Sequence, residues 1–179
     1  IGFRPEERMA AFAQVDTFDE ERFVVLASKR GQIKKMPLIA FGNPRRKGIM
    51  AMTLDEGDEV IGAAVTDGSA EIVLAKRAGK AIRFAESKVR PMGRSAGGVR
   101  GATLAGADDE VIGMVCVRDP QAALLVVTRN GFGKRSRLED YRVTNRGGLG
   151  VITVNITERN GPMVTIKEVA EDDEVMIST

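Results

Sequence analysis

The feature that most limits the fold of this chain is an internal repeat with a period of about 50 residues. In each copy a run rich in Val, Ile and Leu leads into a turn glycine and continues with basic residues. The turn glycines Gly31, Gly79 and Gly131 are 48 and 52 positions apart. Such a period constrains the architecture before any local prediction, because each copy is one structural unit that cannot bury its apolar face alone.

Two further elements keep step with the turn glycines. One starts at a glycine, and its copies span residues 48–54, 98–104 and 150–156. The other starts with an acidic pair in the first two copies and continues as an apolar run, and its copies span residues 58–65, 109–116 and 162–166. Three elements in register argue against a chance resemblance among the copies.

Each copy contains about four short runs of strand-forming residues bounded by Gly, Asn, Asp or Pro, which is typical of strands joined by tight turns. Glycine at the turns supplies the positive φ that hairpins require. We therefore predict a single all-β domain built as a propeller-like array of four-stranded blades, each covering its neighbour. A two-sheet sandwich, the alternative, would give irregular spacing. The predicted blades span about residues 22–69, 70–120 and 121–170, with partial blades at 1–21 and 171–179.

The composition argues against an enzyme. The chain has no histidine and one cysteine, Cys116, so a zinc site or a catalytic triad cannot be assembled from the usual residues. Tyr141 stands without a catalytic cluster, which favours a packing or loop role. No apolar run approaches the roughly 18 residues that a membrane span needs. We expect a non-catalytic, cytoplasmic domain without a cofactor, a metal or a membrane contact.

The distribution of charge points to a polyanionic partner, although the net charge is only +2. Basic residues lie between the turn glycine and the second glycine of each copy, whereas acidic residues gather around the third element. A radial stack would join the basic halves into one belt suited to phosphates. Arginine beside glycine-rich segments fits this task, since guanidinium binds phosphate bidentately. The predicted DNA-binding residues are Arg30, Lys34, Lys35, Arg45, Arg46, Lys47, Lys80, Arg83, Lys88, Arg90, Arg94, Arg100, Lys134, Arg135, Arg137, Arg142 and Arg146.

The same residues indicate which nucleic acid would bind. Few aromatic residues are available for base stacking, which disfavours single strands, and no helix is suited to enter a major groove. Sequence-independent contact with the backbone of double-stranded DNA remains. Two alternatives stay open: the basic turns are merely solvated, or the array is a protein-binding propeller. The chain lacks the Trp-Asp signature of the best-known protein-binding propellers.

Four stretches of the sequence have distinctive patterns, at residues 27–35, 84–101, 130–135 and 157–161. The first contains a Ser-x-x-Gly-x-Ile-Lys-Lys pattern that ends at Lys35. Together these stretches resemble the C-terminal domains of DNA gyrase A subunits, which belong to the bacterial type IIA topoisomerases. A shorter relative, the C-terminal domain of the topoisomerase IV C subunit, is the alternative, but residues 99–101 and 157–161 are more similar to gyrase.

The resemblance implies a β-pinwheel, a propeller-like disc whose blades exchange strands and whose basic rim wraps DNA. It further implies that the domain serves an A2B2 holoenzyme, in which the catalytic tyrosine and the ATPase lie elsewhere and negative supercoils are introduced. One departure is the family's box motif, Gln-Arg/Lys-Arg-Gly-Gly-Lys-Gly, which these 179 residues lack. A degenerate counterpart spans residues 145–150, and from the way the chain begins we expect the box itself to lie just upstream.

Overall fold

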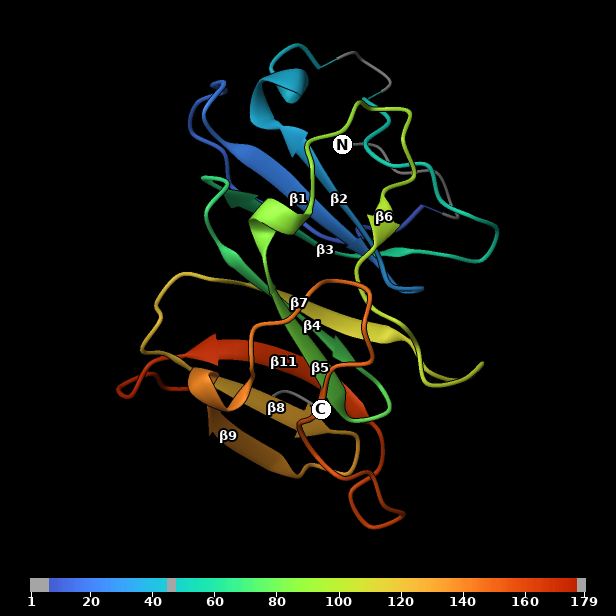
Figure 1. Ribbon diagram of the computed structural model, residues 1–179, viewed down its shortest axis with the longest axis vertical. Helices are drawn as coiled ribbons and strands as arrows, with labels where there is room; N and C mark the ends of the chain where they lie inside the picture. The colour runs from blue at the N-terminus through green and yellow to red at the C-terminus, as the bar shows by residue number, and fades with distance from the viewer. Residues whose placement is uncertain (1–6, 45–47, 177–179) are drawn as a thin grey trace.

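The structure is a computed structural model that describes residues 7–44 and 48–176. The described residues form three antiparallel sheets and three short 3₁₀ helices, with no α-helix (Figure 1). The first sheet has the order β3-β1-β2-β6, with β1 at Phe23–Ser28, β2 at Gln32–Pro37, β3 at Val60–Thr66 and β6 at Val99–Arg100.

The other two sheets repeat this order along the chain. Written from the same edge, the second sheet is β7-β4-β5-β10, with β4 at Glu71–Lys76, β5 at Lys80–Ala85, β7 at Val111–Val117 and β10 at Val151–Ile152. The third sheet is β11-β8-β9, with β8 at Ala123–Thr128, β9 at Gly133–Arg137 and β11 at Met163–Val169. The 3₁₀ helices are η1 at Leu38–Phe41, η2 at Glu86–Lys88 and η3 at Leu138–Asp140.

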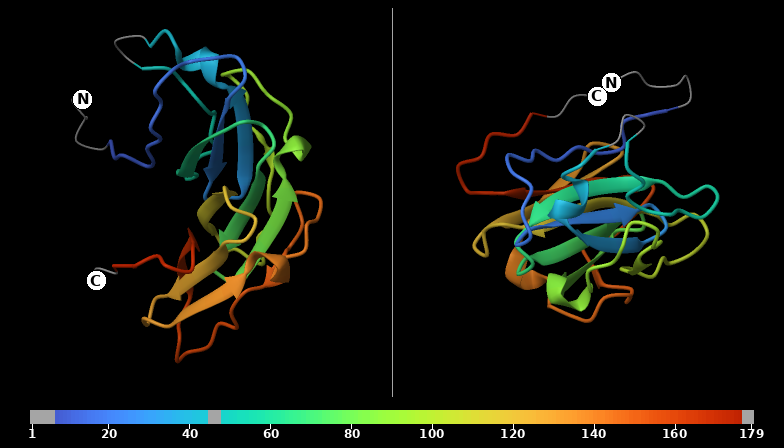
Figure 2. Two further views of the ribbon diagram at one scale, coloured as in Figure 1. Left: turned by 90° about the vertical axis from the view of Figure 1, so that its left-hand side faces the viewer. Right: turned by 90° about the horizontal axis from the view of Figure 1, so that it is seen from above.

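The three sheets follow one another in an arc (Figure 2). Strand β3 contacts β7, and β7 contacts β11, so these three strands line the concave side. The segments that carry η2 and η3 lie on the convex side. The predicted all-β, propeller-like arrangement is confirmed, although the third sheet has three strands among the described residues.

Each sheet is built on a hairpin whose turn contains one of the repeated glycines. The values of φ are +85° at Gly31, +83° at Gly79 and +82° at Gly131, as the turn prediction requires. The hairpins β1–β2, β4–β5 and β8–β9 also share one register. Lys35, Arg83 and Arg135 therefore occupy equivalent positions, opposite Val25, Val73 and Leu125.

The fourth strand of a sheet comes from the next copy of the repeat. Strand β6 pairs with β2 through Gln32↔Arg100 and Ile33↔Val99, and β10 pairs with β5 in the same way. The strand exchange implied by the resemblance is therefore present. The first-copy counterpart, residues 48–54, forms no strand, because its partner would belong to a sheet before β1 and the described residues 7–22 contain no strand.

Two apolar cores lie between the sheets, one between the first and second sheets and one between the second and third. The side chains of β4 alternate, as a strand buried on both faces requires: Ile72 and Leu74 join the core shared with the first sheet, whereas Val73 and Ala75 join the core shared with the third. Tyr141 packs in this second core and is 2% exposed, in agreement with the packing role expected for it.

Charged side chains are also buried between the first and second sheets. Lys34 is fully buried, and its ammonium donates to three backbone carbonyls. Lys35 lies with its Nζ 3.4 Å from Oε1 of Glu86, and neither side chain is more than 5% exposed. Glu86 also accepts a hydrogen bond of 2.8 Å from the Thr66 hydroxyl. The second copy thus supplies a carboxylate that neutralises a cation of the first.

Replacing Gly31 with Ala is expected to destabilise the fold by about 1–3 kcal/mol. A Cβ at this position would lie 2.6 Å from the carbonyl oxygen of Ala102, and its φ is unfavourable for any side chain. Chemical denaturation measures the loss. Gly106→Ala is the control, since no atom lies within 4 Å of its Cβ position. Equal midpoints for the two variants would contradict this account of the turn.

Replacing Lys35 with Ala is expected to cost about 3–5 kcal/mol, because it leaves the buried Glu86 carboxylate without its counter-charge. Arg135→Ala removes the equivalent cation of the third copy, which is exposed, and should cost less than about 0.5 kcal/mol. The two unfolding free energies are compared under the same conditions. Similar small losses in both variants would show that the Lys35–Glu86 pair contributes nothing to stability.

Candidate nucleic-acid interface

Two segments on the convex side form the candidate interface, and we call them the first rim loop (residues 86–100) and the second rim loop (residues 138–152). Each begins with a 3₁₀ helix and ends in the exchanged strand. Each is fixed to the sheet of the preceding copy: the Met92 amide donates to the Lys35 carbonyl at 2.8 Å, and the Thr144 amide donates to the Arg83 carbonyl at 2.9 Å. The rim loops therefore cross from one sheet to the next (Figure 2).

Exposed cations gather on these loops. Among the described residues, no protein acceptor bonds their side-chain nitrogens, so their charged groups face solvent. They are Lys88, Arg90, Arg94, Arg100 and Arg142. The structure thus brings five of the predicted DNA-binding residues together on the convex side, on segments contributed by two successive copies.

Arg146 has a different environment, although it was predicted for the same role. Its side chain is half-buried, and its guanidinium donates to the carbonyl of Lys88 at 3.0 Å and to that of Arg100 at 2.9 Å. The second rim loop is thereby tied to the first. The Arg146 guanidinium therefore links the two rim loops, and this role differs from the phosphate contact predicted for it.

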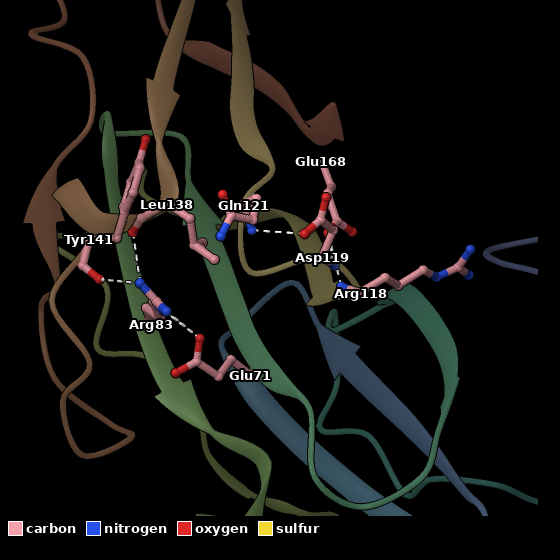
Figure 3. Close-up of polar contacts among 8 residues, drawn as sticks. All are labelled: Glu71, Arg83, Arg118, Asp119, Gln121, Leu138, Tyr141 and Glu168. Atoms are coloured by element: carbon pink, nitrogen blue, oxygen red, sulfur yellow. Dashed lines mark hydrogen bonds and ion pairs between the residues drawn. The ribbon is translucent and has the colours of Figure 1, made fainter. Parts of the chain in front are cut away.

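Arg83 is held inside the protein (Figure 3). Its guanidinium pairs with the Glu71 carboxylate and donates to the carbonyls of Leu138 at 2.7 Å and Tyr141 at 3.1 Å. Lys34 and Lys35 are buried as described above. The structure corrects the assignment of these three residues to DNA contact, because the exchanged strand and the rim loop cover the strands on which they lie.

The remaining predicted cations lie on or beside the hairpins. Arg30 is exposed next to the first turn, and Lys80 is half-buried at the start of β5. Lys134, Arg135 and Arg137 are exposed because β9 is the outer strand of its sheet in the described residues. Arg137 pairs with Glu139 at 3.0 Å, with both side chains largely in solvent, and such a pair adds little stability.

Three predicted residues, Arg45, Arg46 and Lys47, lie outside the described residues. Their part in the interface stays a prediction.

Two aspartates have a role that the charge pattern did not reveal. Oδ1 of Asp58 accepts the Arg30 amide at 2.9 Å, and Oδ1 of Asp109 accepts the Ala78 amide at 2.9 Å. Each aspartate therefore holds the hairpin turn of its own sheet. The available signal was that both are the first residue of the third element in their copies. Burial lowers the pKa of the neighbouring Lys76, an effect that Asp109, 3.9 Å away, opposes.

Other features of the described residues suggest no chemical centre. No group of His, Cys, Asp and Glu within these residues is placed to hold a metal ion. Burial raises the pKa of the Cys116 thiol to about 12, so the thiol stays protonated at neutral pH. A cavity of about 240 Å³ lies between β5 and the second rim loop, with Arg142 and Asn145 in its wall. No helix in the described part of the chain is long and apolar enough to cross a membrane.

Comparison with known sequences places this architecture in a family. A family described as "DNA gyrase C-terminal domain, beta-propeller" matches residues 22–67, 71–118 and 122–176. The DNA gyrase A subunit of Chlamydia pneumoniae is 45% identical over 177 residues, which cover 98% of this chain and 21% of that protein. The DNA gyrase A subunit of Salmonella typhimurium is 43% identical over 173 residues, covering 97% and 20%. The chain thus spans about a fifth of the length of these relatives.

Solved structures agree on the fold. A DNA gyrase A C-terminal domain superposes with a TM-score of 0.86 at 23% identity, covering 97% of this chain and 57% of that one. The C-terminal domain of a DNA topoisomerase IV superposes with a TM-score of 0.81 at 23% identity, covering 88% and 49%. The family match and the sequence relatives, together with three sheets in an arc, two of which receive a strand from the next copy, show that the chain belongs to the family of DNA gyrase C-terminal β-propeller domains.

Proposed function

We propose that this domain binds double-stranded DNA along its convex side and bends it, without catalysing a reaction itself. One observation carries the proposal: the five exposed cations of the rim loops lie on segments from successive copies, where the arc of sheets brings them together. A duplex carries one negative charge per roughly 1.7 Å of its axis. Cations spaced along the convex side of a curved array can therefore contact the phosphates of a bent duplex.

The contact would be independent of base sequence. The rim loops carry arginine, lysine, glycine and small residues rather than an element that fits a groove. Arginine and backbone amides recognise phosphates, which position a protein without reading sequence. Bending 20–30 base pairs by 40–90° costs about 1–6 kcal/mol, and several phosphate contacts would offset this cost.

In the cell, the bent duplex would serve a larger enzyme. The curated relatives are named as DNA gyrase A subunits, and this chain matches a fifth of their length. We propose that DNA cleavage belongs to the rest of the A subunit, with ATP hydrolysis in the B subunit, in a cytoplasmic A2B2 assembly. The present domain would present a crossing of fixed handedness to that assembly, so that strand passage yields negative supercoils.

A second candidate, a protein-binding surface, rests on apolar residues of the second rim loop. Val143, Leu149 and Ile152 are 51%, 47% and 63% exposed. Exposed apolar patches often mark protein interfaces. Salt separates the two functions: neutralising six to ten phosphates makes DNA affinity fall by about a thousandfold or more between 50 and 200 mM salt, whereas an apolar contact has no such dependence.

Wrapping is tested by ligating a nicked circular plasmid in the presence of increasing amounts of the intact protein that carries these residues. After removal of the protein, the linking number is compared with that of a protein-free ligation. A shift that grows with protein concentration is the expected result. An unchanged linking number, with salt-sensitive binding retained, would limit the domain to binding DNA without imposing a handed path.

Replacing Arg90, Arg94 and Arg100 with Ala is expected to weaken DNA binding and to reduce the magnitude of the slope of log affinity against log salt by about 0.9 for each lost phosphate contact. Fluorescence anisotropy with a short duplex at several salt concentrations measures both. The matched control replaces Arg118, Arg129 and Lys167, three exposed cations outside the rim loops, and so removes the same charge. Equal losses in the two triple variants would mean that net charge, and not the rim, governs binding.

A further inference from the structure

We propose that Lys34 of the first copy is a positioning residue: it holds the backbone of the first rim loop and leaves the Arg94 guanidinium free for DNA. The inference rests on the proposed function, because it concerns how one cation of that interface is presented. It adds a residue that touches no DNA and lies in a different copy from the cation it serves.

The geometry around Lys34 is closed. Its Nζ donates to the carbonyls of Ala51 at 2.6 Å, Arg94 at 2.8 Å and Ala96 at 2.8 Å. An ammonium group has three hydrogens, so every donor is used. The side chain is fully buried, and these carbonyls replace the water that it has lost. Two of the three acceptors belong to the next copy, on either side of Ser95.

Thr53 holds the same short segment from the first copy. Its hydroxyl donates to the Ser95 carbonyl at 3.0 Å, and its amide donates to the Ala96 carbonyl at 3.4 Å. Three consecutive carbonyls, from Arg94 to Ala96, thus point toward the first copy. The side chain of Arg94 is left on the exposed side of the loop.

The next copy shows what happens without such a lysine. Ile82 occupies the position equivalent to Lys34, opposite Leu74 instead of Leu26. Its aliphatic side chain carries no hydrogen-bond donor that could hold a rim loop. The equivalent of Arg94 is Arg146, whose own guanidinium bonds the carbonyls of Lys88 and Arg100. Where the buried lysine is present, the arginine faces solvent. Where it is absent, the arginine itself fastens the loop.

Lys134 of the third copy provides a natural control. It occupies the same register position, opposite Val126, and its Nζ donates to the Thr153 carbonyl at 3.1 Å. This carbonyl corresponds to that of Ala51. Lys134 is exposed and makes no bond to a further rim loop within the described residues. The two bonds to Arg94 and Ala96 are therefore what distinguishes Lys34.

A double-mutant cycle in the intact protein tests the inference, with a short DNA duplex as the probe and the salt dependence of its affinity as the readout. Arg94→Ala should reduce the magnitude of the salt slope by about 0.9 when Lys34 is present. In the Lys34→Met background the same change should reduce it by much less, because the released loop no longer holds Arg94 at the phosphate. Arg142→Ala should have the same effect in both backgrounds, and Lys134→Met should leave the effect of Arg94→Ala intact.

Thermal unfolding checks that Lys34→Met is folded. Should it fail to fold, Thr53→Val replaces it, since this variant removes the hydroxyl that bonds the Ser95 carbonyl and Met50 Sδ and leaves the Lys34 bonds in place; the effect of Arg94→Ala should then be smaller than in the unmodified protein. An Arg94→Ala effect of equal size in all backgrounds would overturn the inference while the rim still binds DNA through Arg142. If the unmodified protein shows no salt-dependent binding of the duplex, the proposed function is overturned, and the inference with it.

Discussion

The pairing of a two-residue strand with the sheet of the preceding copy is the contact on which the rest of the structure depends. Strand β6 adds to β2, and β10 adds to β5, in each case next to a glycine turn of the preceding copy. The Gly31 carbonyl accepts the amides of Gly101 and Ala102, and the Gly79 carbonyl accepts those of Thr153 and Val154. Each copy is thereby joined to its neighbour through backbone bonds, which do not depend on the side chains that vary between copies.

This exchange decides which cations are free. Because the exchanged strand pairs with the preceding sheet, each rim loop lies against that sheet. The rim loop then covers cations on β2 and β5. Lys35 then requires Glu86, and Arg83 requires Glu71 and two carbonyls. Cations that lie on the covering loop stay in solvent. The basic residues of a copy therefore fall into two sets. Cations on the covered strands are buried and stabilise the packing of the sheets, whereas cations on the rim loops stay exposed and available to phosphates.

Much of the fold could be predicted from the sequence, because hairpins and their turns are local. The glycines at residues 31, 79 and 131 mark the turns, and the runs rich in Val, Ile and Leu that lead into them mark the strands β1, β4 and β8. The prediction of the candidate site was less complete. Lys34 and Arg94 are both basic residues near glycine, and no local pattern distinguishes the buried one from the exposed one.

The sequence by itself determined the repeat, the strand content, the turn positions and the separation of basic from acidic segments, since each of these depends on residues close together in the chain. Only the tertiary structure decided which cations face solvent, that Asp58 and Asp109 hold the turns, and that Arg146 fastens a loop while Arg94 does not. The physical reason is that burial and hydrogen-bond partners are set across copies: the carbonyls that bind Lys34 include two that lie about 60 residues further along the chain.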